Sequence, residues 1–231
     1  MKILGIIPAR GGSKGVKGKN IKKLSGEPLI YYTIKEALKS DLTSLIVSTD
    51  DEEISKVARS YGVDVPFKRP TNLSNDTAKS IDVAIHALNE MERIYGFSYD
   101  AIMLLQPTTP FRTCEDINDC LNLMRIHPDA DSVISVVDVK GHHPARMKYI
   151  QDGWLIDPPF CEEIENQNRQ ELRPMFIRNG AIYLTRKTIL LKKSYKGEKC
   201  LAYEMPGERS VNIDNLQDFE YAEWLHSKFL K

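Results

Sequence analysis

The chain opens with an apolar run that leads directly into a glycine-rich basic loop, Ile3-Leu4-Gly5-Ile6-Ile7-Pro8-Ala9-Arg10-Gly11-Gly12-Ser13-Lys14-Gly15-Val16-Lys17-Gly18-Lys19-Asn20. Residues 10–23 contain six Lys or Arg and no acid, although the whole chain balances 32 basic against 32 acidic residues. Glycines let backbone N–H groups approach phosphate oxygens closely, and clustered positive charge attracts a compact polyanion. A solvated surface loop is the simpler alternative. The position of the loop directly behind an apolar run favours phosphate binding.

The spacing of the glycines excludes two common phosphate loops. No glycine in this loop begins the sequence Gly, four residues, Gly-Lys-Ser/Thr, so the P-loop is absent. The dinucleotide fingerprint G-x-G-x-x-G is absent because no two of these glycines stand two residues apart. Asp50 resembles the ribose-binding acid of that fold, but it lies far beyond the usual offset of about 20 residues. The sequence therefore predicts a phosphate loop of a third kind.

Length and composition indicate one large domain of 231 residues with room for a modest insertion. Its zero net charge argues against a general nucleic-acid binder, because such proteins carry a basic excess. The four cysteines form no C-x-x-C pair and are interpreted as reduced thiols. No apolar run is long enough to span a membrane, and no signal peptide is recognisable. We therefore expect a cytoplasmic protein.

Apolar runs alternate with helical patterns over the first 138 residues. The expected strands are Ile3–Ile7, Leu45–Ser48, Ala101–Leu105 and Ser132–Val137, each apolar almost throughout. Asp76 and Thr113 stand where helix N-caps are expected. This alternation predicts an α/β fold with a doubly wound, mixed and mostly parallel sheet, in which ligands bind at the carboxyl ends of the strands.

The pattern changes between about 140 and 175, where turns and polar residues replace the strand–helix units. Such an insertion is typical of an arm, a lid, an oligomer contact or a long loop. We interpret residues 1–231 as a single domain with an inserted arm at about 140–175. The elements expected after it are the strands Ala181–Leu184, Cys200–Glu204 and Val211–Ile213, and a helix over 216–229.

Several polar residues follow the expected strands and are candidates for ligand binding. Gln106 and Thr108 lie between prolines that fix the backbone, so they can be presented rigidly at the ligand edge. Arg69 can hold a phosphate or a nucleobase edge. The adjacent His142 and His143 lack a third ligand at metal spacing, so a zinc site is not expected there. Structural turns remain the alternative for each of these segments.

The polar residues Asn212 and Asp214 alternate with the apolar residues Val211 and Ile213. Both polar side chains should therefore lie on one face of a strand. Two oxygen donors at this spacing suit Mg²⁺, a hard cation that is usually shared with substrate phosphates. A solvated strand followed by a helix cap is the alternative interpretation.

The residues resemble the N-acylneuraminate cytidylyltransferase (CMP-sialic acid synthetase) family. The similarity covers nearly the whole chain in the order of the family's motifs. These are Pro8-Ala9-Arg10, Ser13-Lys14-Gly15, Lys19-Asn20, Val47-Ser48-Thr49-Asp50, Arg69-Pro70, Asp76-Thr77, Leu105-Gln106-Pro107-Thr108, His142-His143-Pro144, Asn179-Gly180-Ala181-Ile182-Tyr183, Ile213-Asp214 and Asp218. Each motif is weak alone, whereas this many in order is specific.

The resemblance implies a nucleotidyltransferase-like fold that binds CTP and a nine-carbon sugar acid. The implied nucleotide-binding residues are Arg10, Ser13, Lys14, Lys19, Asn20, Arg69 and Ser80. The implied acceptor-binding residues are Gln106, Thr108, Arg146, Arg169, Asn179 and Tyr183. Arg10, Lys19 and Asp214 would carry catalysis, with Mg²⁺ on Asp214 and Asn212. Because the family's arm reaches into the site of a second copy, a homodimer is implied.

Two departures from the family's pattern bear on the acceptor. Asn212 stands where relatives usually have Asp, so the metal would rest mainly on Asp214, water and triphosphate. Ile177-Arg178 precede Asn179 where several sialic acid enzymes have Arg-Pro, which shifts the arginine by one residue on a strand. Legionaminic acid or another nonulosonate therefore stays open beside sialic acid, and pseudaminic acid is the least expected. A guanylyl-, uridylyl- or Kdo cytidylyltransferase and a non-catalytic nucleotide sensor are the alternative functions.

Overall fold

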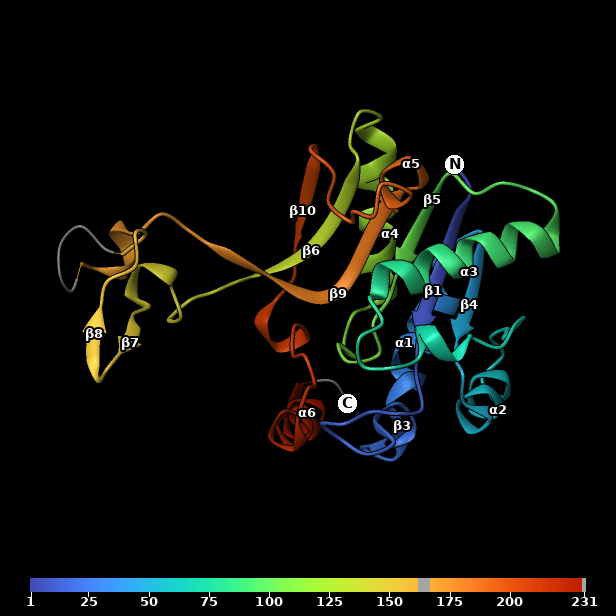
Figure 1. Cartoon of the computed structure of the whole chain (residues 1–231), viewed down its shortest axis with the longest axis horizontal. Helices are drawn as coiled ribbons and strands as arrows, with labels where there is room; N and C mark the ends of the chain where they lie inside the picture. Colours follow the sequence, from blue (N-terminus) through green and yellow to red (C-terminus); the bar gives the residue numbers. More distant parts are fainter. Residues whose placement is uncertain (162–166, 230–231) are drawn as a thin grey trace.

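The computed structural model describes residues 1–161 and 167–229 and contains a six-stranded sheet in the order β10-β6-β9-β5-β1-β4 (Figure 1). β1 pairs in parallel with β4 and β5, and β10 with β6, whereas β9 runs antiparallel to β5 and β6. This confirms the predicted α/β fold with a doubly wound, mixed and mostly parallel sheet. The strands are β1 (Ile3–Pro8), β4 (Ser44–Ser48), β5 (Ala101–Leu104), β6 (Ser132–Asp138), β9 (Phe176–Arg186) and β10 (Cys200–Glu204).

Helices cover both faces of the sheet because successive strand residues point to opposite sides. In β1, Ile3 and Ile7 pack against one set of helices, and Leu4 and Ile6 pack against the other. A third apolar cluster joins α6 to the segment that follows β1. The first set is α1 (Leu29–Leu38), α2 (Glu52–Ser60) and α4 (Cys114–Ile126), the second is α3 (Ser80–Tyr95) and α5 (Lys187–Leu190), and the last helix is α6 (Leu216–Phe229).

The helix starts confirm one predicted cap and correct another. Thr113 caps α4 in a reciprocal capping box, as expected. Asp76, in contrast, caps no helix, because α3 begins at Ser80 and Lys79 occupies its N-cap position without a side-chain bond. The Asp76 carboxylate instead forms ion pairs with two cations of the basic loop.

The predicted strand over Val211–Ile213 is wrong. The segment is an irregular loop in which the Ile213 N–H donates to the Thr108 carbonyl at 2.8 Å. Ile213 is fully buried in the cluster beneath α6, whereas Asn212 is exposed. The alternation of polar and apolar residues therefore reflects burial against a helix and not a β-ladder.

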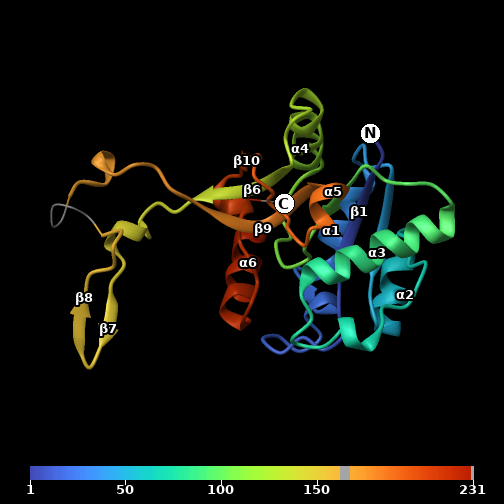
Figure 2. The same cartoon turned by 45° about the horizontal axis from the view of Figure 1, so that its top comes forward.

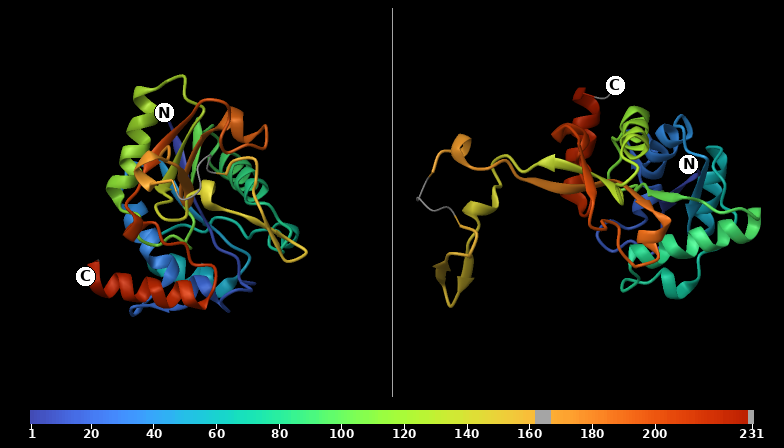
Figure 3. Two further views of the ribbon diagram at one scale, coloured as in Figure 1. Left: turned by 90° about the vertical axis from the view of Figure 1, so that its left-hand side faces the viewer. Right: turned by 90° about the horizontal axis from the view of Figure 1, so that it is seen from above.

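Residues 140–161 and 167–175 form an arm that projects from the sheet (Figures 1, 2 and 3). The ends of β6 and β9 pair beyond the body as a two-stranded ribbon, and the arm carries a hairpin of β7 (Tyr149–Gln151) and β8 (Trp154–Ile156). Large apolar side chains on this hairpin are exposed, with Ile150 at 77% and Trp154 at 75%. Isolated hairpins are only marginally stable in water, and exposed apolar patches mark interaction sites.

The described ranges contain no helix that is long and apolar enough to cross a membrane. A small hairpin of β2 (Lys23–Leu24) and β3 (Glu27–Pro28) follows the basic loop. It leads the chain into α1 and closes the first strand–loop–helix unit.

Candidate active site

A cleft of about 470 Å³ lies where β1 and β5 end, at the carboxyl edge of the parallel strands. All the residues predicted to bind a nucleotide line this cleft, together with Gln106, Thr108, Asn212 and Asp214. Its lining residues are Pro8, Arg10, Ser13, Lys14, Gly15, Lys19, Asn20, Arg69, Leu73, Asn75, Asp76, Ala78, Ser80, Val83, Gln106, Pro107, Thr108, Asn212 and Asp214. Segments more than 200 residues apart in the sequence therefore meet in one cavity.

A hydrogen bond from a buried side chain and two glycines fix the conformation of the basic loop. The Asn20 amide is buried and donates to the Arg10 carbonyl at 3.0 Å, which ties the two ends of the loop together. Gly18 adopts a left-handed conformation (φ 61°), which glycine tolerates best. At Gly15, any side chain would collide with the Asp214 carbonyl oxygen. The loop therefore rests against the segment that carries Asp214.

Three cations of the loop face the cleft, and each already has an oxygen partner. Arg10 and Lys14 pair with Asp76 at 2.9 and 2.6 Å. Lys19 donates to the Ile213 carbonyl at 2.7 Å and lies 3.9 Å from Asp214. Burial lowers the pKa of Lys19 from its ordinary value, because the charged form loses hydration, and Asp214 partly offsets this. The cleft thus presents a group of cations suited to a polyphosphate.

Arg69 forms a rigid wall on the side of the cleft that faces α3. Arg69 is 5% exposed, and its guanidinium donates to the hydroxyl and the carbonyl of Ser48, the last residue of β4. Burial lowers the pKa of Arg69 to about 10. Ser80, at the first turn of α3, lines the same side. This wall combines a fixed donor with a hydroxyl, a combination that can recognise the edge of a nucleobase.

Asn212 and Asp214 lie together at the rim of the cleft. The Asn212 amide nitrogen donates to the Asp214 carboxylate at 2.7 Å, and Asp218 accepts the Asp214 backbone N–H at 2.9 Å. The predicted proximity of Asn212 and Asp214 is therefore met by a turn before α6 rather than by a strand. Among the described residues, no group of three or more His, Cys, Asp or Glu is placed to hold a metal ion.

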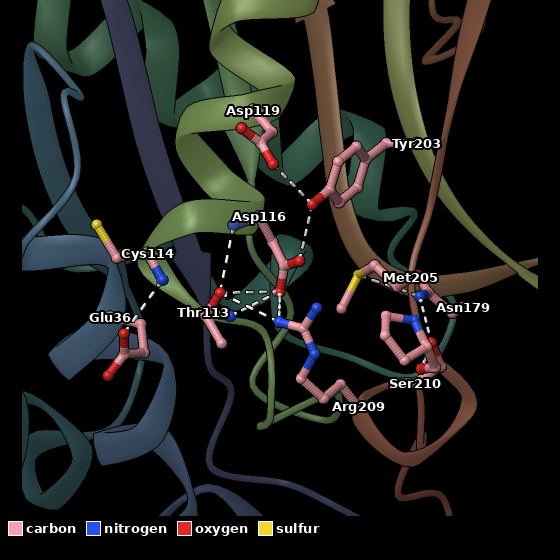
Figure 4. Close-up of polar contacts among 11 residues, drawn as sticks. Glu36, Thr113, Cys114, Asp116, Asp119, Asn179, Tyr203, Met205, Arg209 and Ser210 are labelled. Carbon is pink, nitrogen blue, oxygen red and sulfur yellow. Dashed lines mark hydrogen bonds and ion pairs between the residues drawn. The ribbon is translucent and has the colours of Figure 1, made fainter.

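The segment from η5 (Gly207–Arg209) to Asp214 is anchored from two sides (Figure 4). Arg209 donates to Asp116, a carboxylate that is 1% exposed at the start of α4, at 2.6 Å. Tyr203 of β10 donates to the other oxygen of Asp116 at 2.9 Å. The fully buried carboxylate thus holds the segment that delivers Asp214 to the cleft.

Asn179 forms the second anchor and lies deeper than the resemblance implied. Its side chain is buried, accepts from Ser135 at 2.6 Å and donates to Ser210 at 2.9 Å. Gly180 follows with φ 81° at a register break between β9 and β6, and a Cβ there would stand 3.1 Å from the Gln106 amide oxygen. The Asn-Gly pair therefore forms a bulge that brings β9 close behind Gln106.

The other predicted acceptor residues lie away from the lining of the cleft. Tyr183 packs in β9 against the ring of Tyr195 with their centroids 5.4 Å apart, and burial raises its pKa. Arg146 lies on the arm and donates to the Gln167 carbonyl at 2.7 Å. Arg169 lies in η4 (Arg169–Glu171) of the same arm. Within one chain, the fold brings Gln106 and Thr108 into the cleft and leaves these three residues outside it.

Sequence reasoning assigned no site role to Asp76, Arg112 and Arg209. Arg112 is fully buried and donates to the carbonyls of Gln106 and Thr109, which fixes the loop after β5. Arg112 could have been recognised in the sequence, because it follows an apolar strand and a segment rich in proline and threonine. Asp76 belongs to a family motif, but its ion pairs join it to residues far away in the sequence, as do those of Arg209, so a local pattern does not predict their contacts.

The sequence of the chain is similar to that of several characterised relatives. It is 36% identical over 233 residues to the CMP-N,N'-diacetyllegionaminic acid synthase of Legionella pneumophila, covering 97% of this chain and 96% of that one. It is 35% identical over 223 residues to the N-acylneuraminate cytidylyltransferase of Streptococcus agalactiae and 36% identical over 229 residues to that of Escherichia coli. The alignments cover 95% and 98% of this chain but 52% of each of these relatives, so the chain spans about half their length.

Solved structures agree on the architecture. The fold matches CMP:2-keto-3-deoxy-manno-octonic acid synthetase complexed with CTP, with a TM-score of 0.72 at 18% identity over the full length of both chains. It also matches 4-diphosphocytidyl-2C-methyl-D-erythritol synthase from Anaerococcus prevotii, with a TM-score of 0.67 at 13% identity over 98% of this chain and 99% of that one. The shared fold is an α/β fold with a mixed, mostly parallel sheet.

The carboxyl edge of the sheet carries a basic cleft suited to a polyphosphate. A family model described as cytidylyltransferase matches residues 4–152, most of the chain. The chain therefore belongs to the cytidylyltransferase family, which confirms the resemblance drawn from its motifs.

Proposed function

We propose that the protein transfers CMP from CTP to the anomeric hydroxyl of a nonulosonic acid and releases pyrophosphate. The observation that carries this proposal is the single cleft in which the loop cations, the Arg69 wall and the Asp214 rim face one another. Relatives that cover nearly all of this chain and are named for legionaminic and N-acylneuraminic acid support the acceptor class. CTP and a nine-carbon sugar acid are thus the proposed substrates.

The loop cations bind and stabilise the triphosphate in this reaction. The acceptor oxygen attacks the α-phosphorus in line with the departing pyrophosphate, so negative charge grows on the leaving oxygens. Arg10, Lys14 and Lys19 would neutralise that charge from fixed positions, and electrostatic stabilisation of this kind dominates phosphoryl-transfer catalysis. Because Lys19 is half-buried beside Asp214, its charge acts in a less polar surrounding than a surface lysine.

The base and the acceptor would occupy opposite sides of the cleft. Arg69 and Ser80 line the side proposed for cytosine, where the guanidinium is already oriented by Ser48. Gln106 and Thr108 stand on the β5 side, where the acceptor would lie. This placement leaves the α-phosphate between them, next to Lys19.

The rim residues fit a magnesium ion that is shared with substrate. Mg²⁺ is usually bound by one or two carboxylates together with phosphate oxygens and water. Asp214 supplies one exposed carboxylate and Asn212 one amide oxygen, which must turn towards the ion from its present orientation. When bound, the ion neutralises phosphate charge. Asp214 and Asn212 would hold it against the triphosphate.

The arm supports a homodimer in which each copy completes the other's acceptor site. The exposed hairpin surface needs a partner, and Arg146 and Arg169 lie on this arm. A carboxylate-bearing acceptor would be recognised well by arginine. Within one chain these arginines are distant from the cleft, as Figure 3 shows for the arm as a whole.

A substrate panel tests this function. Pyrophosphate release would be measured with CTP, Mg²⁺ and, in turn, N-acetylneuraminic, legionaminic, pseudaminic and Kdo acids. We expect release with N-acetylneuraminic or legionaminic acid and the least with pseudaminic acid. Tight CTP binding without release for any acid would instead favour a nucleotide sensor, for which the neutral Asn212 in the metal site is the specific observation.

A further inference from the structure

Asp76 occupies the phosphate-binding cations in the free protein. Its two carboxylate oxygens bind different partners, Oδ1 with Arg10 at 2.9 Å and Oδ2 with Lys14 at 2.6 Å. Both cations belong to the basic loop and both line the cleft, as does Asp76 itself. A carboxylate that bridges two cations has the geometry of a bound anion at the place proposed for the triphosphate.

The local structure gives no other task to this carboxylate. Asp76 lies between η2 (Thr71–Leu73) and α3, and it caps neither helix. The turn around it is held by Asn75, whose side-chain oxygen accepts from the backbone N–H and the hydroxyl of Thr77. Within the described residues, Arg10 and Lys14 are the only partners of the Asp76 side chain. Their charges hold its pKa below the ordinary range, so it stays ionised at neutral pH.

Exposure makes these ion pairs easy to exchange. The side chains of Asp76 and Lys14 are 43% and 78% exposed, and exposed pairs of this kind are weak. Lys19 is held differently, because it is largely buried against the Ile213 carbonyl and Asp214. A ligand whose phosphates bridge the loop cations can therefore displace Asp76, and it gives up the energy of these ion pairs when it does.

We propose that Asp76 is a built-in counterion that competes with phosphate for Arg10 and Lys14, so that every ligand whose phosphates need both cations must first displace it. The proposal rests on the proposed function of the cleft. After transfer, the return of Asp76 to the two cations also favours the release of pyrophosphate. The same segment carries Ala78 and Ser80 into the cleft, so displacement of Asp76 takes place next to the proposed base site.

Removal of the charge at constant shape tests the proposal. Isothermal titration of CTP, CMP, tripolyphosphate and pyrophosphate, each with EDTA and with Mg²⁺, would compare wild type with Asp76→Asn. Because one competing charge is lost, we expect CTP, tripolyphosphate and pyrophosphate to bind about three- to tenfold more tightly to Asp76→Asn, with no larger gain for CMP. Pyrophosphate should also inhibit this variant at lower concentration.

Two control variants sharpen the test. Asp76→Glu keeps the charge and should keep the wild-type ratio of CTP to CMP affinity. Asp129→Asn removes another exposed aspartate that pairs with a lysine, Lys199 at 3.1 Å, outside the cleft, and should change nothing.

Each remaining outcome decides a different question. Unchanged affinities in Asp76→Asn, alongside normal CTP binding by wild type, would overturn the counterion role and leave the proposed function intact. Weaker binding by Asp76→Asn in Mg²⁺ alone would also overturn it, because Asp76 would then act as a metal ligand. If wild type bound neither CTP nor tripolyphosphate, that result would contradict both the proposed function and the counterion role of Asp76.

Discussion

The nucleotide side and the acceptor side of this molecule are built in different ways. Every residue predicted to bind the nucleotide lines one cleft within a single chain. On the acceptor side, Gln106 and Thr108 line that cleft, whereas Asn179 is buried behind it and Arg146 lies on the projecting arm. All the residues proposed to bind the nucleotide therefore meet within one copy. The acceptor half depends on the buried support of β9 and, by our proposal, on a second copy.

Substitution of Lys19 should have the largest effect on turnover, because Lys19 is one of the proposed nucleotide-binding residues that meet within one chain. Loss of one fixed charge at a developing oxyanion typically costs about 10²–10³-fold in turnover. We expect Lys19→Ala to lower kcat for pyrophosphate release by this amount. Lys17→Ala is the matched control, because Lys17 is exposed in the same loop outside the cleft lining and should leave turnover unchanged. Equal losses in both variants would point to a general effect of loop charge.

The arm should separate the two halves by function. Trp154→Glu combined with Leu155→Glu places charges on the exposed hairpin, which should dissociate the proposed dimer and lower turnover at least tenfold. CTP affinity should stay near wild type, because the proposed nucleotide-binding residues meet within one chain. Light scattering and titration calorimetry measure the two effects. Ile126→Glu, at an exposed apolar position at the end of α4, is the control. An unchanged oligomeric state with full turnover would refute the role of the arm.

The anchor of the rim segment predicts a smaller effect. Arg209→Leu leaves the buried Asp116 carboxylate without its cation, which should cost about 1–3 kcal/mol in the free energy of unfolding. It should also raise the Mg²⁺ concentration needed for half-maximal activity, because Asp214 loses its support. Tyr203→Phe removes another donor to Asp116 from β10 and should destabilise the protein without shifting the Mg²⁺ requirement. Identical metal titrations for both variants would contradict the anchoring role.

The smallest expected effect is at Asn212. Asn212→Asp adds a charge beside Asp214 and should lower the Mg²⁺ requirement a few-fold, because anionic ligands raise affinity for hard cations. Asp214→Ala should nearly abolish turnover, which makes it the reference for a lost metal site. Coincident Mg²⁺ titrations for wild type and Asn212→Asp, or full activity in Asp214→Ala, would refute the site.

The sequence predicted what adjacent residues determine. Uniformly apolar runs became the central strands, and Thr113 with its Asp three residues later became a capping box. The basic loop was recognisable because its charges and glycines are contiguous. Each of these features depends on interactions within a few residues, so a local pattern contains the information.

Features set by distant partners were predicted poorly. Asp76 has the residue type of a helix cap, but its partners Arg10 and Lys14 lie more than 60 residues away in the chain. The alternation around Ile213 resembles a strand, but it arises from burial beneath α6. Asn179 matches a family motif, yet its side chain forms hydrogen bonds with Ser135 and Ser210 instead of lining the cleft. Local propensity cannot contain such contacts.

The central claim is that one cleft binds the triphosphate and the cytosine of CTP, and a thermal shift measurement tests it most directly. At about 100 times its Kd, a ligand stabilises the native state by about 2.7 kcal/mol, which corresponds to roughly 5–10 °C for a chain of this size. We predict this shift for wild type with CTP, little shift with UTP or GTP, and loss of most of the CTP shift in Lys19→Ala. Equal shifts with all three nucleotides, or a full CTP shift in Lys19→Ala, would contradict the account.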